Sequence, residues 1–229
     1  MISSVDDQGG APTKTLVQKV LDAVQCAKDV DLSAITARLR KEPLFSPKEP
    51  LYPEIWPGEH YKLLAGFVES MRPRKVVEVG TYQGLSALAL LARLPVASQL
   101  LTLDIVPWDE MRPTFLQETD FSDGRLRQVL GDLSQREFFA QFAPELSSCE
   151  LLFIDAPKNV VFERTLLEFL ETIPTSPNLL VVFDDIRQWN MLSIWRGIRR
   201  PKMDLTSFGH WSGTGVVEWN GCQPGTHAA

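Results

Sequence analysis

Short apolar runs without regular polar alternation recur along the chain after Gly58. Strands that are buried on both faces of a parallel sheet have this pattern, because neither face meets water. The runs are Lys75–Val79, Leu100–Leu103, Arg127–Leu130, Leu151–Ile154 and Leu179–Phe183. We therefore predict five parallel strands.

Stretches of helical character lie between these runs, and their alternation with strands predicts an α/β doubly wound domain. The predicted helices are Glu59–Met71, Leu85–Arg93, Ser134–Phe142, Val160–Thr172 and Gln188–Ile198. Near the end, Asp204–Phe208 and Gly213–Trp219 predict two strands joined by a glycine-containing turn. The expected fold is Rossmann-like, with a mostly parallel seven-stranded sheet and an antiparallel C-terminal hairpin.

The N-terminal part of the chain has a different pattern. Apolar residues recur at helical spacing from Thr13 to Lys28, and Asp31–Arg40 predicts a second helix. Five prolines between residues 42 and 58 predict an extended connector. We expect a disordered tail at 1–12, a helical segment and connector at 13–57, the α/β domain at 58–220 and a tail at 221–229. The apolar first helix could serve a homodimer.

Charge and composition narrow the classes of partner. The net charge of −6 disfavours a nucleic-acid binder, which relies on clustered Lys and Arg. No apolar run approaches the ~20 residues that cross a bilayer, and the acidic start does not resemble a signal peptide. The three cysteines, Cys26, Cys149 and Cys222, are far apart and predict no disulfide framework. We expect a cytoplasmic protein.

The first strand ends in a glycine-containing loop, at the edge of the sheet where ligands of such folds bind. Its sequence is Glu78-Val-Gly-Thr-Tyr-Gln-Gly-Leu-Ser86, followed by a helix. Glycines allow a sharp turn and close approach to a ligand. The carboxylate of Glu78 would repel a pyrophosphate and suits a ligand with a cationic amino group. The alternative is a simple strand-to-helix turn.

Acidic residues also follow the next two strands. Asp104 is placed to accept hydrogen bonds from both ribose hydroxyls of a nucleoside ligand, as in dinucleotide-binding folds. Asp132 could reach an adenine amine. Both residues have the alternative role of capping the segment that follows.

Three carboxylates and a lysine are expected at the ends of the fourth and fifth strands: Asp155, Lys158, Asp184 and Asp185. Crowded carboxylates repel one another unless a proton or a cation intervenes. Mg²⁺ suits such a site, and a lysine of lowered pKa can act as a base. The alternative is that Lys158 only neutralises Asp155 and that Asp185 caps a helix. Because successive strand residues point apart, the chain must turn at Asp184 for both aspartates to converge.

Between Pro57 and Trp219 the chain resembles the S-adenosylmethionine-dependent O-methyltransferases of the catechol and caffeoyl-coenzyme-A type. The resemblance implies that the first loop and the acidic strand ends hold the cofactor. The residues in this set are Glu78, Gly80, Thr81, Tyr82, Gly84, Ser86, Asp104, Ile105, Asp132 and Asp155. It also implies that Asp155, Asp184 and Asp185 bind a metal, with Lys158 and Asp155 as catalytic residues. Asp185 stands where the family has Asn, so the resemblance does not decide whether the chain binds Mg²⁺.

The implied activity is methyl transfer to a hydroxyl of a small-molecule acceptor, with or without Mg²⁺. The alternatives are a metal-independent O- or N-methyltransferase with His210 or Lys158 as base, and a non-catalytic cofactor-binding protein. Trp189, Trp195 and Trp211 could line an acceptor pocket or pack in the core. His210 has no partner that the sequence reveals.

Overall fold

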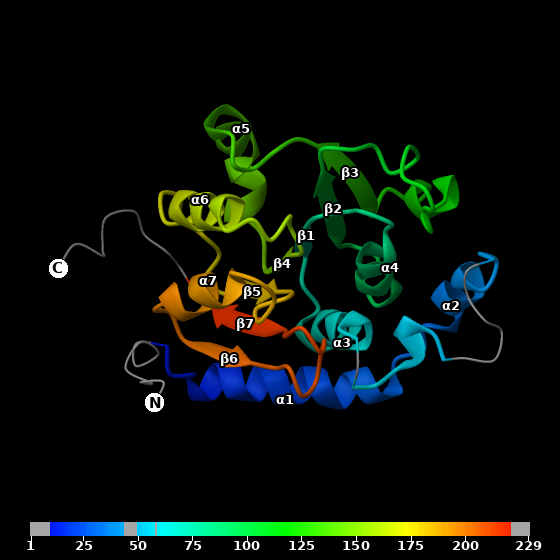
Figure 1. Cartoon of the computed structure of the whole chain (residues 1–229), viewed down its shortest axis with the longest axis horizontal. Coiled ribbons are helices and arrows are strands. Elements are labelled where there is room, and N and C mark those ends of the chain that lie inside the picture. The colour runs from blue at the N-terminus through cyan, green and yellow to red at the C-terminus, as the bar shows by residue number, and fades with distance from the viewer. Residues whose placement is uncertain (1–9, 44–49, 58, 221–229) are drawn as a thin grey trace.

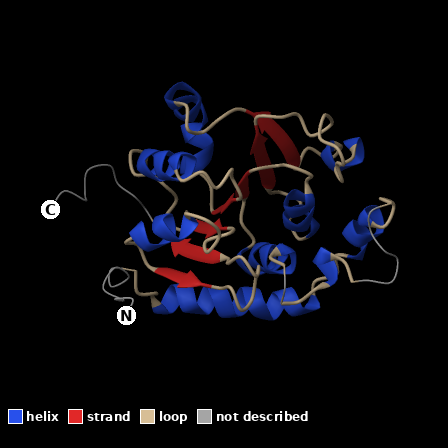
Figure 2. Cartoon of the chain, viewed as in Figure 1, coloured by secondary structure: helices blue, strands red, loops and turns tan. Residues whose placement is uncertain are grey.

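The computed structural model describes residues 10–43, 50–57 and 59–220. It contains one seven-stranded sheet of order β3-β2-β1-β4-β5-β7-β6 (Figures 1 and 2). The neighbours from β3 to β5 pair in parallel, whereas β7 is antiparallel to both β5 and β6. The strands are β1 Lys75–Val79, β2 Gln99–Asp104, β3 Leu126–Leu130, β4 Leu151–Ile154, β5 Leu180–Phe183, β6 Lys202–Asp204 and β7 Gly215–Glu218. The predicted fold class is confirmed.

Helices cover both faces of this sheet. They are α1 Lys14–Asp29, α2 Ser33–Leu39, α3 Tyr61–Met71, α4 Leu85–Ala92, α5 Arg136–Ser147, α6 Val161–Leu170 and α7 Met191–Gly197, with short 3₁₀ turns at Tyr52–Glu54 and Glu118–Phe121. Successive strand residues point to opposite faces. Val76 therefore packs in the core with α1 to α4, and Val77 packs in the core with α5 to α7. Burial on both faces explains the unbroken apolar runs.

Helix α1 joins the start of the chain to its end. Thr13 caps α1 by accepting from Leu16 N at 3.0 Å, and its hydroxyl donates to Glu218 of β7 at 2.6 Å. The carbonyl of Gly10 accepts from Lys202 N of β6 at 3.0 Å. Figure 1 shows α1 running along β6 and α3. The buried face of α1 is thus covered by its own chain, and the homodimer stays a prediction.

The expected strand at Asp204–Phe208 is wrong. Strand β6 ends at Asp204, where the pattern predicted its start, because the Asp204 carboxylate accepts from Thr206 N at 3.0 Å and forms a turn. Lys202 was not expected in a strand, yet its stem is buried and its ammonium donates to Trp195 O at 2.5 Å. The segment that follows β6 is therefore a loop at the carboxyl edge of β5.

Other boundaries agree with the prediction within three residues, except that α5 continues past Phe142 through Pro144 to Ser147. Residues 1–9, 44–49, 58 and 221–229 lie outside the described residues, as do the predicted tails in those ranges and the middle of the connector. Within the described ranges, no helix has the length and apolar character that crossing a bilayer requires.

Candidate active site

Gly80 ends β1 in a place that only glycine can occupy. Its φ of +104° is a conformation that side chains disfavour, and a Cβ there would lie 2.1 Å from the Asp155 carbonyl oxygen. Its amide donates to Leu103 O of β2 at 2.8 Å. Gly84, with φ +86°, begins α4, and a Cβ on it would meet Leu116 at 2.3 Å. Gly80 therefore allows β1, β2 and β4 to end close together.

A cleft of about 610 Å³ opens at the carboxyl ends of β1 to β4. It lies where the strand order reverses between β1 and β4, the usual ligand position in such sheets. One wall comes from the ends of β1, β2 and β3, and the other from the β4–α6 connection. The lining residues include Gly80, Tyr82, Asp104, Ile105, Asp132, Ser134, Asp155, Pro157, Asn159, Val161 and Phe162. Its size suits a nucleoside-containing ligand.

Asp104 is held at the rim of this cleft by backbone amides. Its Oδ2 accepts from Tyr82 N at 2.9 Å, and its Oδ1 accepts from Ile105 N and Val106 N at 2.7 and 3.2 Å. A carboxylate oxygen has capacity for further hydrogen bonds. Asp104 is thus a rigid acceptor, oriented before any ligand arrives.

Glu78 lies in the core rather than in the cleft wall. Its side chain is fully buried, and Oε2 accepts from Thr102 Oγ1 at 2.5 Å. Burial raises its pKa to about 8, although hydrogen bonds from Ser86 and Thr102 oppose the shift. Its Oε1 has no hydrogen-bond partner among the described residues. A donor supplied by a ligand would satisfy this oxygen.

Glu78→Gln tests this burial through the pH dependence of stability. The folded pKa lies above the unfolded value of 4.5, so folding takes up a proton between pH 4.5 and about 8, and stability falls as pH rises through that window. We expect the variant to melt on the order of 5 °C above the wild-type chain at pH 8.5, and close to it at pH 4.5. Thermal melts at both pH values measure this, and a constant difference between them would contradict it.

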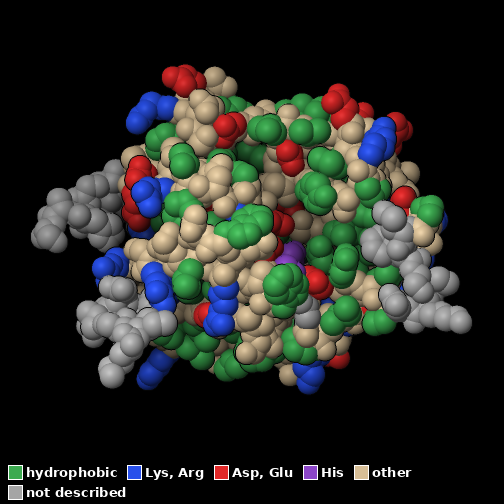
Figure 3. Space-filling view, viewed as in Figure 1, with side chains coloured by type: hydrophobic (Ala, Val, Ile, Leu, Met, Phe, Trp, Pro, Cys, Tyr) green, Lys and Arg blue, Asp and Glu red, His purple; other side chains and the backbone are tan. Residues whose placement is uncertain are grey.

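A second group of polar residues lies beside the cleft; we term it the acid–histidine cluster. It contains Glu59, His60, Asp155, Lys158, Asp184, Asp185 and His210. Figure 3 shows a histidine side chain among acidic ones near the middle of the visible face. Asp185 has a φ of +59°, and this turn lets both aspartates after β5 converge. Asp155 belongs to both the cleft and the cluster.

Lys158 stands among the three aspartates. Its Nζ pairs with Asp155, lies 2.9 Å from Asp185 Oδ2 and 3.8 Å from Asp184 Oδ2. Burial alone would lower its pKa, but the aspartates outweigh burial and raise the pKa well above the ordinary value. Lys158 is therefore an ammonium counterion in this state and becomes a base only if another cation neutralises the aspartates.

The ring of His210 contacts four polar side chains, those of Glu59, Asp184, Asp185 and Ser212. Its Nε2 lies 2.8 Å from Glu59 Oε2, and its Nδ1 contacts Ser212 Oγ, which donates to Asp185 Oδ1. Burial lowers its pKa, but Asp184, Asp185 and Glu59 outweigh that effect and raise it to about 12. His210 is therefore an imidazolium that donates from both ring nitrogens.

Comparison with known proteins finds a family that resembles the part of the chain around this site. The model of a family described as a methyltransferase domain matches residues 77–186, which carry the cleft and all four of the predicted metal-site and base residues, Asp155, Lys158, Asp184 and Asp185. Residues 77–186 are thus similar to a methyltransferase domain. No curated protein matches the sequence.

Solved structures share the fold of this chain at low identity. A methyltransferase from Podospora anserina with bound SAH is 16% identical with a TM-score of 0.57, covering 91% of this chain and 97% of that chain. An O-methyltransferase from Bacillus cereus in complex with SAH is 17% identical with a TM-score of 0.55, covering 82% and 92%. The MycE methyltransferase of the mycinamycin biosynthetic pathway, in complex with Mg and SAH, is 16% identical with a TM-score of 0.51, covering 87% and 57%. This likeness concerns the fold.

The cleft divides the predicted cofactor residues into two groups. Gly80, Tyr82, Asp104, Ile105, Asp132 and Asp155 line the cleft. Glu78, Thr81, Gly84 and Ser86 do not line it. Thr81 is buried against Thr102, with hydroxyls 2.7 Å apart, so its side chain ties β1 to β2. Asp132 accepts from Ser134 N at 2.8 Å, which is the capping role, while also bordering the cleft.

The sequence did not predict that apolar residues after β4 line the cleft, or that His60 belongs to the acid–histidine cluster. Val161 and Phe162 gave no signal besides belonging to a helix, yet they line the cleft. Among the tryptophans, Trp195 is buried, whereas Trp189 and Trp211 are largely exposed. The amides of Ile186 and Arg187 donate to Gly213 O and Ser212 O at 2.9 Å, so the loops that carry Trp189 and Trp211 lie side by side.

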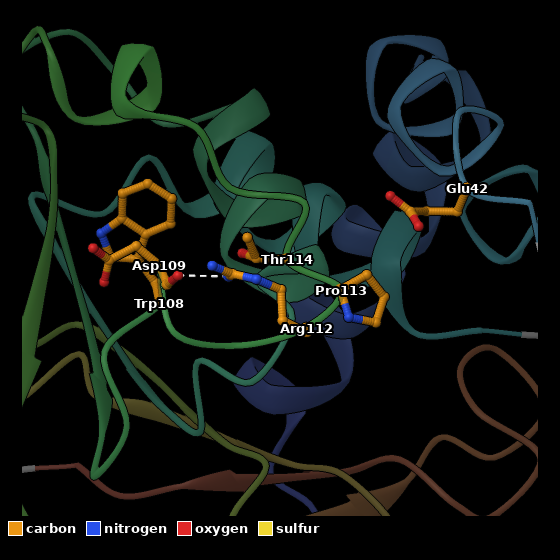
Figure 4. A pocket seen from close by; sticks show the side chains of 6 residues that line it. All are labelled: Glu42, Trp108, Asp109, Arg112, Pro113 and Thr114. Carbon is orange, nitrogen blue, oxygen red and sulfur yellow. Dashed lines mark hydrogen bonds between the residues drawn. The ribbon is translucent and has the colours of Figure 1, made fainter.

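A second hollow, of about 670 Å³, lies away from the cleft and shares none of its lining residues (Figure 4). It is lined by Glu42, Trp108, Asp109, Arg112, Pro113 and Thr114. Arg112 donates to the carbonyls of Asp109 and Met111 at 2.5 and 2.7 Å. Its guanidinium is thus engaged with its own loop, and the hollow adds nothing to the cleft.

Proposed function

We propose that this chain binds S-adenosylmethionine in the cleft and transfers the methyl group to a hydroxyl of a small molecule. The observation that carries the proposal is the position of Asp104, a carboxylate oriented by backbone amides at the rim of a nucleoside-sized cleft. Ribose hydroxyls are suitable donors to it. Exposed Ile105 and Val161 provide apolar contacts for an adenine ring.

The residues fit the rest of the cofactor. The methionine part carries an ammonium group, and the buried Glu78, two residues before Gly80, has an Oε1 without a hydrogen-bond partner among the described residues. Gly80 leaves no space for a side chain between that loop and Asp155. In this arrangement the sulfonium end would lie toward Asp155, where the cleft meets the acid–histidine cluster.

The reaction is a direct displacement. The acceptor oxygen attacks the methyl carbon, the carbon–sulfur bond breaks, and S-adenosylhomocysteine leaves as the neutral thioether. The hydroxyl proton must be removed, and positioning the two reactants supplies much of the rate. A divalent cation held by Asp155, Asp184 and Asp185 would lower the pKa of the hydroxyl. With these carboxylates neutralised, Lys158 is placed to accept the proton.

A metal-independent reaction is the second candidate. The observation in its favour is Lys158 itself, whose ammonium already lies within 4 Å of all three aspartates. His210 is a poor base in that case, because its pKa is about 12. The net charge of −6 favours a small-molecule acceptor over nucleic acid. We also propose a cytoplasmic location, since Cys26 and Cys149 are free thiols.

Asp104→Asn tests the proposed function. The change removes the negative charge and one acceptor, and we expect S-adenosylhomocysteine to bind about tenfold to a hundredfold more weakly by calorimetry. The matched control is Asp123→Asn, which alters an aspartate that receives the amide of Arg125 at 2.9 Å outside the cleft. The control should bind normally. A folded wild-type chain that binds neither S-adenosylmethionine nor S-adenosylhomocysteine would disprove the function.

A further inference from the structure

The acid–histidine cluster contains more potential ligand atoms than its internal cations can satisfy. Three sets of residues bring one ligand atom each within 4.8 Å of the others. They are His60 with Asp155 and Asp184, Asp184 with Asp185 and His210, and Glu59 with His60 and His210. Four carboxylates stand against Lys158 and the imidazolium of His210. The cluster thus gathers these groups in a largely buried place.

The set with Asp185 and His210 is already satisfied within the protein. Ser212 Oγ donates to Asp185 Oδ1 and contacts His210 Nδ1, while His210 Nε2 pairs with Glu59 at 2.8 Å. An ion at this place would have to displace Ser212. The side chains of Asp185 and His210 therefore need no additional partner.

The set with His60 is not satisfied. The His60 side chain is 5% exposed, and neither of its ring nitrogens makes a hydrogen bond to any described residue. Asp184 Oδ1 is likewise buried without a hydrogen bond, although it lies 3.3 Å from His60 Nδ1 and 3.5 Å from His210 Nδ1. Buried polar atoms are normally partnered, so two such groups facing each other call for a ligand.

The spacing fits a metal ion. Two atoms bound to one first-row ion at about 2.1 Å stand roughly 3.0 to 3.4 Å apart. His60 Nδ1 and Asp184 Oδ1 are 3.3 Å apart. Asp155, which also pairs with Lys158 through Oδ1, supplies the third ligand atom of this set. His60 itself is held by ring contacts with Tyr61 and Phe153, at 4.5 and 5.3 Å between centroids, so its position is fixed.

We propose that His60, Asp155 and Asp184 bind a divalent transition-metal ion such as Mn²⁺, Co²⁺ or Zn²⁺ in preference to Mg²⁺. Imidazole nitrogen favours these ions, whereas Mg²⁺ prefers oxygen ligands alone. Asp155 also lines the cleft, so the ion would stand beside the proposed methyl donor. The inference deepens the proposed function by placing His60 instead of Asp185 beside Asp155 and Asp184. It rests on the proposed function only for the role of the ion in catalysis.

The test uses the full chain, freed of metal by a chelator and then titrated with Co²⁺. We expect one bound ion per chain with visible cobalt absorption, and no displacement by a hundredfold excess of Mg²⁺. His60→Asn should weaken Co²⁺ binding at least tenfold while S-adenosylhomocysteine still binds normally. His210→Asn removes an imidazole outside the proposed ligand set and should weaken Co²⁺ binding less than threefold.

A second measurement covers the case in which His60→Asn fails to fold. Electron spin-echo spectroscopy of the Mn²⁺-loaded wild-type chain should detect a coupled imidazole nitrogen. Equal affinity for Mg²⁺ and Co²⁺, no nitrogen coupling, or no metal binding at all would each overturn the proposal. If S-adenosylhomocysteine binds in those experiments, the proposed function stands without this ion; if the metal binds and S-adenosylhomocysteine does not, only the function fails.

Discussion

Gly80→Ala should destabilise the chain by about 3 kcal/mol and abolish binding of S-adenosylhomocysteine. The new Cβ would lie 2.1 Å from the backbone oxygen of Asp155, and its φ of +104° disfavours any side chain. Neither the end of β1 nor that of β4 can move without breaking its pairing, since Asp155 N donates to Val79 O at 2.8 Å. Urea unfolding measures the first effect and calorimetry the second.

Gly124→Ala is the matched control. Gly124 has a positive φ of +76°, but no atom lies within 4 Å of an added Cβ. We expect a loss of about 1 kcal/mol from backbone strain and normal binding of S-adenosylhomocysteine. The difference between the two variants isolates the contact with Asp155. Equal losses of stability would show that the contact at Gly80 is relieved at no cost.

Lys158→Met should cost about 3 kcal/mol of stability at pH 7. It removes the cation from three aspartates of low exposure, and carboxylates left without a partner in such a place are costly. Stability should recover toward that of the wild-type chain as the pH falls, because protonation of the aspartates removes their repulsion. Urea unfolding at pH 7 and pH 5 measures both effects.

Two further lysine variants separate the roles of Lys158. Lys75→Met breaks a more exposed pair with Glu145 and should cost no more than about 1 kcal/mol. Lys158→Arg keeps the charge and should keep most of the stability, but an arginine cannot accept the hydroxyl proton, so methyl transfer should be lost. An active Lys158→Arg enzyme would exclude Lys158 as the base.

The strands could be predicted from the sequence because each is buried on both faces, which leaves a continuous apolar run. The run at Leu151–Ile154 matches β4 residue for residue. Strand β6 could not be predicted in this way, since it lies at the edge of the sheet and includes Lys202, whose buried ammonium donates to the carbonyl of Trp195.

Gly80 and Asp104 could be predicted because their positions depend only on the local sequence. Gly80 stands where the chain turns after β1, and Asp104 is the acidic residue at the end of β2. The position of the Glu78 side chain, in the core instead of in the cleft, could not be predicted. Glu78 stands two residues before Gly80, inside β1, and its side chain lies in the core, where Thr102 and Ser86 donate hydrogen bonds to it. The pairing of His60 with Asp184 joins a residue before α3 to one after β5, and no spacing along the chain reveals it.

The partners of α1 are translated at widely separated times. The helix leaves the ribosome early, and α3, which covers its apolar side, follows within some tens of residues. Thr13, however, pairs with Glu218, a partner 205 positions later. At translation rates of about 5 to 20 residues per second, that partner is made roughly 10 to 40 seconds afterwards. During this interval the nascent chain holds a packed α1–α3 pair whose end awaits the last two strands, so a translational pause before Lys202 would leave β5 as an unprotected sheet edge.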